Sequence, residues 1–417
     1  MTRIFRSIAT VIALVALVKA EPLSLPLQEG NVTLDLDGQA LPFEVTSGTG
    51  RSFAFYGPQY ERVYGSDSCE TSYYKCYFCP KENPCKDIFE RKKWTAEFED
   101  GVYHYVEHNV TLDIGSSTDI WMRRVPNFTI GLVVHFPTPY VRAPMPLLGL
   151  SFGRRDIPET FLEQLKRRKV VSTLSYSLHA RERGPGISGI LTLGDDSETT
   201  GSSYVGFSED VFVDGLQMAA RLGPLTLFDS VGNQLRRPHK RTRPQSALLD
   251  SGSTVTYIFE EEFNAVMDVT WKGMKKANTD LKIKKKKLEC KGTESDGVAE
   301  AQMIRREAVP YLPTLEYQIG NAPHTVNISM EPKHYVHSCE EVCCQMNIAP
   351  LSDFFGTTIF GHSLFRAYDV KVEHSSKRIY FSPGQRPPKP TAPPQSAGTR
   401  STTKRRKSLI RRLTLKR

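Results

Sequence analysis

Two stretches of the sequence place an Asp after apolar residues and before a Gly and several hydroxyl side chains. They are TLDIGSSTDIWM at 111–122, which holds Asp113, and ALLDSGSTVTYIF at 247–259, which holds Asp250. A carboxylate that activates water must be held still. Such a loop can hold it, because Gly allows a tight turn and hydroxyl groups hydrogen-bond the carboxylate oxygens. Two such carboxylates could together carry out acid–base hydrolysis.

The loop around Asp250 has the stronger context. The apolar residues 247–249 predict the end of a buried strand, Ser251 and Gly252 predict a tight turn, and Ser253 follows with a further hydroxyl. A segment with acidic residues first and lysines last, 260–277, then predicts a helix, because that order suits the helix dipole.

The elements that must position these loops are mostly strands. Short stretches rich in Val, Thr, Phe and Tyr recur between Gly, Asp, Asn and Pro, and their period of two predicts a mainly β protein. Only 158–169 and 260–277 have a clear helical pattern. Residues 21–383 exceed one comfortable core, so we expect two domains, at 21–200 and 201–383.

Several further segments, together with the Asp250 loop, resemble the pepsin-like aspartic proteases, peptidase family A1. They are PLLGLSF at 146–152, PETFLEQLKRRKVVSTLSYSL at 158–178, SGILTLGDDSE at 188–198 and TTIFGHSLFRAYDVKVEHSSKRIYFSP at 357–383. The resemblance covers most of the chain and implies an all-β class with a few short helices. It also implies a bilobal double-barrel fold with a peptide-binding cleft between the lobes. His362 is a departure, because the family usually has Asp at that place.

The order of the segments decides which loop belongs to the first lobe. Too few residues separate Asp113 from the Leu-Leu-Gly at 147–149 to hold the flap hairpin that the family has between them. WTAEFEDGVYHYVEHNVTLDIG at 94–115 itself resembles that flap, with Phe98 at the usual Tyr. We therefore expect the stretch that begins at Asp113 to be a turn.

The first catalytic loop then falls in LPFEVTSGTGRSFAFYG at 41–57, where the resemblance aligns Gly48 with the first catalytic Asp. Thr49 and Gly50 match the family pattern, whereas Arg51 departs from it. The expected substrate-binding residues are Phe98, Thr49, Gly50, Gly252 and Ser253.

This alignment predicts an impaired enzyme, because the family's two acids share one proton and fill complementary roles. With Gly48 at the first position, Asp250 is the retained member of the pair, and we expect little or no peptidase activity. The alternative is an active acid endopeptidase in which Asp113, Asp35 or Asp37 supplies the second carboxylate. We expect no metal and no cofactor, a peptide or protein ligand in the cleft, no nucleic acid, and a monomer.

Other features predict export to an oxidising compartment. Residues 1–20 read as a secretory signal peptide, with a basic start and an apolar run too short to span a bilayer. Sequons for N-glycosylation occur at Asn31, Asn109, Asn127 and Asn327. The eight Cys form an early group at 69–85 and a late group at 290–344, which predicts disulfides within each half. A zinc site at 69–85 is the alternative. Adjacent Cys343 and Cys344 should pair with different partners.

The basic charge belongs to the C-terminal tail. The formal net charge is +9, but residues 383–417 hold 11 Lys and Arg and no acid, which leaves the remainder near −2. Residues 384–417 are rich in Pro, Ser and Thr and then in Lys and Arg, so we expect disorder. A third hypothesis is therefore a surface-binding protein that acts through residues 400–417 on an anionic surface.

Overall fold

Alternating apolar and polar residues build most of the strands, as the sequence predicts. In the computed structural model, Leu23, Leu25 and Leu27 of one strand are buried while Ser24 and Pro26 are exposed. The described residues are 20–72, 74–98, 101–115, 122–137, 145–183, 186–197, 203–208, 218–236, 245–278, 288–290, 302–351 and 357–383. The expected signal peptide and the basic tail therefore lie outside them, as do residues 116–121 after Asp113.

Two large sheets form the two halves of the chain up to Gly384, which is one compact unit. The seven-stranded sheet has the order β2 (Asn31–Leu36), β3 (Gln39–Thr46), β8 (Leu147–Gly149), β4 (Phe53–Phe55), β7 (Arg123–His135), β6 (Gly101–Ile114) and β5 (Lys93–Phe98), and β2 also pairs with β6. The eight-stranded sheet has the order β18 (His324–Met330), β17 (Thr314–Asn321), β12 (Ala219–Phe228), β14 (Gln245–Leu249), β22 (Thr357–Phe360), β15 (Thr256–Phe259) and β21 (Ile348–Leu351), and β13 (Gln234–Arg236) pairs with β12.

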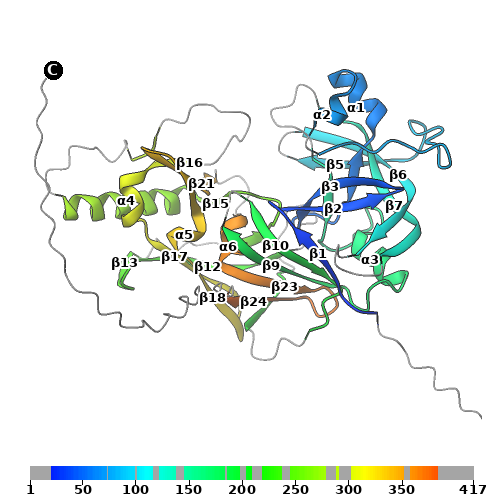
Figure 1. Ribbon diagram of the computed structural model, residues 1–417. Coiled ribbons are helices and arrows are strands. Elements are labelled where there is room, and N and C mark those ends of the chain that lie inside the picture. The colour runs from blue at the N-terminus through cyan, green and yellow to red at the C-terminus, as the bar shows by residue number, and fades with distance from the viewer. Residues whose placement is uncertain are drawn as a thin grey trace, which may run out of the picture. The chain divides into compact units, whose positions relative to one another are not determined.

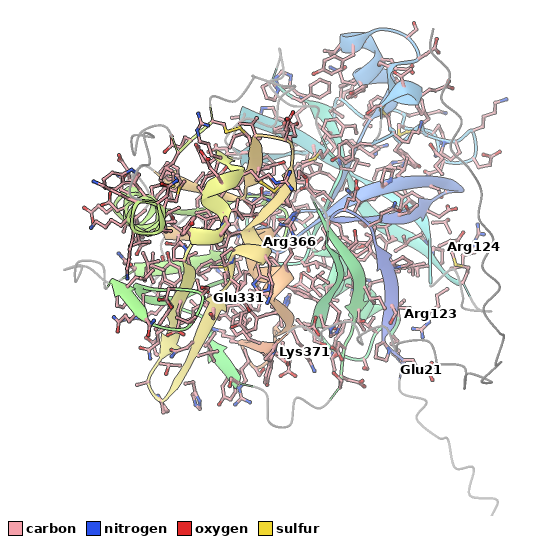
Figure 2. All side chains as sticks on the ribbon, turned by 60° about the vertical axis from the view of Figure 1, so that its left-hand side comes forward. Glu21, Arg123, Arg124, Glu331, Arg366 and Lys371 are labelled. Carbon is pink, nitrogen blue, oxygen red and sulfur yellow. A yellow bond between two sulfur atoms is a disulfide. The ribbon has the colours of Figure 1, made fainter. Side chains whose placement is uncertain are left out.

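A six-stranded sheet combines strands from both halves of the sequence. Its order is β1 (Leu23–Leu27), β10 (Ile187–Leu193), β9 (Ser175–Arg183), β23 (Tyr368–Glu373), β24 (Arg378–Pro383) and β11 (Ser203–Gly206). Figure 1 shows β1, β9, β10 and β23 between the strands of the two large sheets. The buried Lys371 of β23, labelled in Figure 2, donates to the carbonyl of Ser197 and pairs with Glu373 at 3.4 Å. A smaller sheet contains β16 (Gln302–Arg305), β20 (Cys343–Met346) and β19 (Val336–Cys339).

The helices are few and mostly short, which confirms the mainly β class. Within the described residues they are α1 (Gly57–Tyr64), α2 (Ser68–Thr71), α3 (Phe161–Arg167), α4 (Glu260–Ala277), α5 (Pro332–Tyr335), α6 (His362–Ala367) and the 3₁₀ helix η2 (Arg306–Tyr311). Both predicted helices are present. Thr160 and Glu163 form a capping box that fixes the start of α3.

The cysteines pair as the two sequence groups predict. The disulfides are Cys69–Cys76, Cys79–Cys85, Cys290–Cys343 and Cys339–Cys344, so the adjacent Cys343 and Cys344 do have different partners. Four disulfides fit an oxidising compartment. In the described part of the chain, no helix is both long and apolar enough to cross a membrane.

Candidate functional site

The candidate site lies where β3 and β14 end and their loops meet. Val45, next to the last residue of β3, is paired with Leu148 of the parallel strand β8. The last residue of β14, Leu249, is paired in the same way with Phe360 of the parallel strand β22. Each loop then returns through a short strand, so that Phe53 pairs with Leu147 in one unit and Tyr257 with Ile359 in the other. The two units are therefore structural repeats of each other.

Reciprocal hydrogen bonds join the two loops with twofold symmetry. The N–H of Ser47 donates to Ser251 Oγ at 3.1 Å, and the N–H of Ser251 donates to Ser47 Oγ at 3.0 Å. Each hydroxyl in turn donates at 2.8 Å to a carbonyl of the other loop, Ser47 to Leu249 and Ser251 to Val45. Both Ser side chains are fully buried. These bonds fix the correspondence of Ser47 with Ser251.

This correspondence corrects the predicted alignment by two residues. If Ser47 matches Ser251, then Thr46 matches Asp250 and Gly48 matches Gly252. The close approaches agree: a Cβ on Gly48 would lie 2.6 Å from Asp250 Cγ, and a Cβ on Gly252 would lie 2.8 Å from Thr46 Cβ. The prediction that Gly48 takes the place of the first catalytic Asp therefore does not agree with these hydrogen bonds, which put Thr46 at that place. Both TSG at 46–48 and GTG at 48–50 fit a loop pattern, and only the cross-loop hydrogen bonds distinguish them.

Asp250 is held through one of its two carboxylate oxygens. Oδ1 accepts hydrogen bonds from Thr46 Oγ1 at 2.9 Å, from the N–H of Gly252 at 2.9 Å and from the N–H of Gly48 at 3.3 Å. Burial raises the pKa of Asp250, and these three hydrogen bonds oppose that rise. Thr46 Oγ1 also accepts a hydrogen bond from the N–H of Gly48 at 3.2 Å. Asp250 Oδ1 accepts the equivalent hydrogen bond from the N–H of Gly252. A hydroxyl thus occupies the place that corresponds to the Asp250 carboxyl.

His362, which stands where the family usually has Asp, positions the Asp250 loop. Its Nε2 lies 3.0 Å from the carbonyl oxygen of Ser251, and its N–H donates to the carbonyl of Ser253 at 2.9 Å. The residue is buried, and it begins α6 directly after β22. The sequence marked His362 only as a departure, and it gave no signal for the roles of Thr46 and Ser47.

The other acids considered for the pair lie on strands of the seven-stranded sheet or, for Asp37, in its β2–β3 turn. Asp113 lies on β6 and forms an ion pair with Arg124 at 3.5 Å, and Figure 2 shows Arg124 at the outer side of this sheet. Asp35 Oδ1 accepts the N–H of Gly38, and Asp37 accepts the hydroxyl of Tyr77 at 2.7 Å. The structure therefore does not bring Asp113, Asp35 or Asp37 to Asp250 by any hydrogen bond or ion pair among the described residues.

The predicted substrate-binding residues divide into two groups. Thr49, Gly50, Gly252 and Ser253 lie in the two facing loops, where Gly50 allows the backbone to approach Phe152 and Ser253 Oγ donates to the Val255 carbonyl. Phe98 ends β5 at the tip of the β5–β6 hairpin.

The ring of Phe98 lies 6.2 Å from that of Phe53 and 5.4 Å from that of Tyr103. It belongs to a separate aromatic cluster on the strand that follows the Thr46 loop. The hairpin predicted as a flap thus packs against β4, the strand that follows the Thr46 loop.

One group of potential metal ligands occurs in the described residues, at Cys79, Cys85 and His108. The two sulfurs are already bonded to each other, so they are not thiolate ligands in this structure. The earlier alternative of a zinc site at 69–85 is not supported by these contacts.

Comparisons with known proteins support the fold. No protein-family model and no curated protein sequence matches the chain. Among solved structures, it is similar to an aspartic proteinase from Irpex lacteus, with a TM-score of 0.58 and 14% sequence identity, over 87% of this chain and 98% of that one. The fold is therefore that of the bilobal aspartic proteinases.

Proposed function

We propose that this chain is an exported peptide-binding protein with the aspartic-proteinase fold and with little or no endopeptidase activity. The observation that carries the proposal is the pairing of Thr46 with Asp250. The fold supplies two symmetric positions at the ends of β3 and β14, and only one of them holds a carboxyl group.

The chemistry of hydrolysis explains why one carboxyl is not enough. A water molecule that attacks a peptide carbonyl needs a base to take its proton while an acid donates one to the substrate. Asp250 can fill either role but not both at once. The Thr46 hydroxyl cannot replace a carboxyl, since an alcohol neither ionises nor takes up a proton near neutral or mildly acidic pH. Loss of general acid–base help alone costs about 10²–10⁴-fold in rate.

The position of Thr46 is nevertheless ready for a carboxylate. The N–H of Gly48 already points at Thr46 Oγ1, as the N–H of Gly252 points at Asp250 Oδ1. Thr and Asp are also similar in size. The substitution Thr46→Asp should therefore place a second carboxyl beside Asp250 without moving either loop.

The test is cleavage of reduced, carboxymethylated lactalbumin across about pH 3 to pH 7, the range that brackets carboxyl titration. We expect the wild type to be silent and Thr46→Asp to cleave the substrate. Thr46→Asn is the matched control, because it has the same shape as Thr46→Asp and no charge. Thr46→Asp combined with Asp250→Asn should again be silent.

Either of two results would contradict the proposal. Cleavage by the wild type that disappears in Asp250→Asn would show that one carboxyl, or an acid not considered, is sufficient. A well-folded Thr46→Asp variant without activity would show that more than the second carboxyl is missing. Binding of a fluorescent statine-containing peptide by the silent wild type would support the peptide-binding part.

A further inference from the structure

The four sequons differ in what the fold does with their Asn side chains. An N-linked glycan is bulky and is attached at Nδ2, so the amide must reach solvent. Asn109, Asn127 and Asn327 are exposed on strands of the two large sheets, whereas Asn31 is only 9% exposed. The same sequence motif thus occurs in two structural settings.

Asn31 is the first residue of β2 and closes the tight turn that follows β1. Its N–H and carbonyl both pair with Gln28, and its Nδ2 donates to the Glu29 carbonyl at 3.1 Å. A sugar on this amide would have to displace the packing around it. The folded structure is therefore incompatible with a glycan at Asn31.

Asn109 is arranged in the opposite way. It lies on β6 opposite Thr129 of β7, and the Thr129 hydroxyl donates to Asn109 Oδ1 at 2.9 Å. This bond engages the amide oxygen rather than Nδ2, and the residue is exposed. Asn127, two residues before Thr129, is also exposed. The Arg168 side chain donates a hydrogen bond to its backbone carbonyl.

Asn327 lies on a terminal strand of a sheet. In the described part of the eight-stranded sheet, β18 is at the end and pairs with β17. The N–H of Ser329 donates to the Tyr368 hydroxyl at 2.8 Å and so points away from β17. Alternate residues of a strand direct their backbone groups the same way, so those of Asn327 also face outward.

The composition of β18 makes this edge unusual within the molecule. Terminal strands are commonly protected from pairing with other chains by charged side chains, by Pro or by shortness. β1 and β21 contain Pro26 and Pro350, β5 contains Lys93 and Glu97, and β11 has four residues. β18 reads HTVNISM over seven residues, without Lys, Arg, Pro or acid.

We propose that Asn109, Asn127 and Asn327 carry N-linked glycans, that Asn31 does not, and that the Asn327 glycan shields the exposed first part of β18, which ends before Tyr368 covers Ser329. The inference rests on the export part of the proposed function and is independent of its catalytic part.

The first experiment is site-by-site glycopeptide mapping of the full chain, with its own leader, secreted by a eukaryotic cell line. We expect glycans at three sites, and loss of one glycan mass in each of Asn109→Gln, Asn127→Gln and Asn327→Gln. Thr33→Ala removes the Asn31 sequon at an exposed position without touching the buried amide, and it should leave the mass of the glycans unchanged.

The second experiment measures self-association by sedimentation velocity. Asn327→Gln and Ser329→Ala both remove the Asn327 sequon, and both should increase the dimer and oligomer fraction. Ser329→Thr keeps the sequon and should behave as the wild type. Asn109→Gln is the matched control, because it removes a glycan from β6, an interior strand between β5 and β7.

The outcomes separate this inference from the export proposal. A secreted protein with a glycan at Asn31, or without a glycan at Asn327, would overturn the inference but would agree with the export proposal. A chain that stays in the cytosol without glycans would overturn both. If Asn327→Gln and Ser329→Ala secrete normally and remain as monomeric as Asn109→Gln, the shielding role is wrong.

Discussion

The donors around Asp250 all converge on Oδ1. A carboxyl proton, when present, therefore belongs on Oδ2, the oxygen without these three donors. This arrangement suits a group that must both gain and lose a proton at one defined place. The loop thus keeps the architecture of an acid–base residue although Thr46 supplies no partner for it.

At the residue scale, a substitution of Gly48 tests the close packing of the two loops through stability, without reference to catalysis. A Cβ at this position would meet the Asp250 carboxyl at 2.6 Å, so Gly48→Ala should push the two loops apart. Overpacking of this kind costs about 1–3 kcal/mol. We expect a corresponding loss of stability in urea unfolding, and Gly48→Asp should be at least as harmful.

Gly206 provides the matched control for Gly48. It lies on β11, and a Cβ there would meet no atom within 4 Å. Gly206→Ala should therefore be neutral or slightly stabilising, because Ala restricts the unfolded chain more than Gly does. A Gly48→Ala variant as stable as Gly206→Ala would contradict the packing around Asp250.

The residue scale is also where sequence reasoning failed. Asp250 could be found because an apolar strand, a turn and a helix surround it in the sequence. Its counterpart could not be found from residue types, because Thr46, Ser47 and Gly48 are common loop residues without a carboxylate. Thr46 is recognised as the counterpart of Asp250 only from hydrogen bonds between residues about 200 positions apart. A local sequence pattern carries no information about such contacts.

At the scale of elements, local patterns were sufficient. The acidic start and basic end of α4 depend on neighbours in the sequence, and this helix formed as predicted. The hairpin β5–β6 also formed from the stretch that resembles a flap. The interpretation of Asp113 as a turn residue was less accurate, because Asp113 and Ile114 still belong to β6.

The disulfides provide an element-scale prediction based on loop length. Cys290–Cys343 closes a sequence separation of 53 residues, whereas Cys79–Cys85 closes one of 6. If a disulfide stabilises the fold by reducing the entropy of the unfolded chain, the longer loop adds about 4 kcal/mol to the free energy of unfolding and the shorter about 2 kcal/mol. The Cys290→Ala, Cys343→Ala double variant should therefore lose more unfolding free energy than the Cys79→Ala, Cys85→Ala double variant.

Urea unfolding of the two double variants at one pH checks this difference. Cys339–Cys344 must stay intact in both, since it shares β20 with Cys343. Equal losses would mean that local packing around each disulfide, rather than loop closure, decides its contribution.

At the scale of the whole molecule, two buried histidines limit stability in acid. Burial lowers the pKa of His374, which packs against the rings of Phe152 and Tyr176, to about 4. Burial, and then the charge of Arg91, lowers the pKa of His108 to about 4 as well. These positions keep the imidazoles neutral in the folded protein over most of the mildly acidic range.

The direction of the pH effect follows from proton uptake. Above about pH 6.5 both histidines are neutral in the folded and unfolded chains, so they do not change stability. As the pH falls from 6.5 toward 4, the unfolded chain binds protons that the folded chain does not, and stability declines. For His374 alone, the lowered pKa corresponds to a loss on the order of 3 kcal/mol. Asp250 acts in the opposite direction, because its raised pKa favours the folded form in acid.

The measurement is the free energy of urea unfolding at pH 7.5 and pH 4.5 for matched variants. His374→Phe should reduce the difference between the two pH values, because the unfolded chain then binds one proton fewer. Gly206→Ala is the control, since it changes no ionisable group and a Cβ there would meet no atom within 4 Å. If both variants keep the wild-type difference, His374 does not limit the acid stability of the fold. If His374→Phe reduces it, this fold is better suited to neutral than to strongly acidic surroundings, which agrees with the proposal that the chain is not an acid endopeptidase.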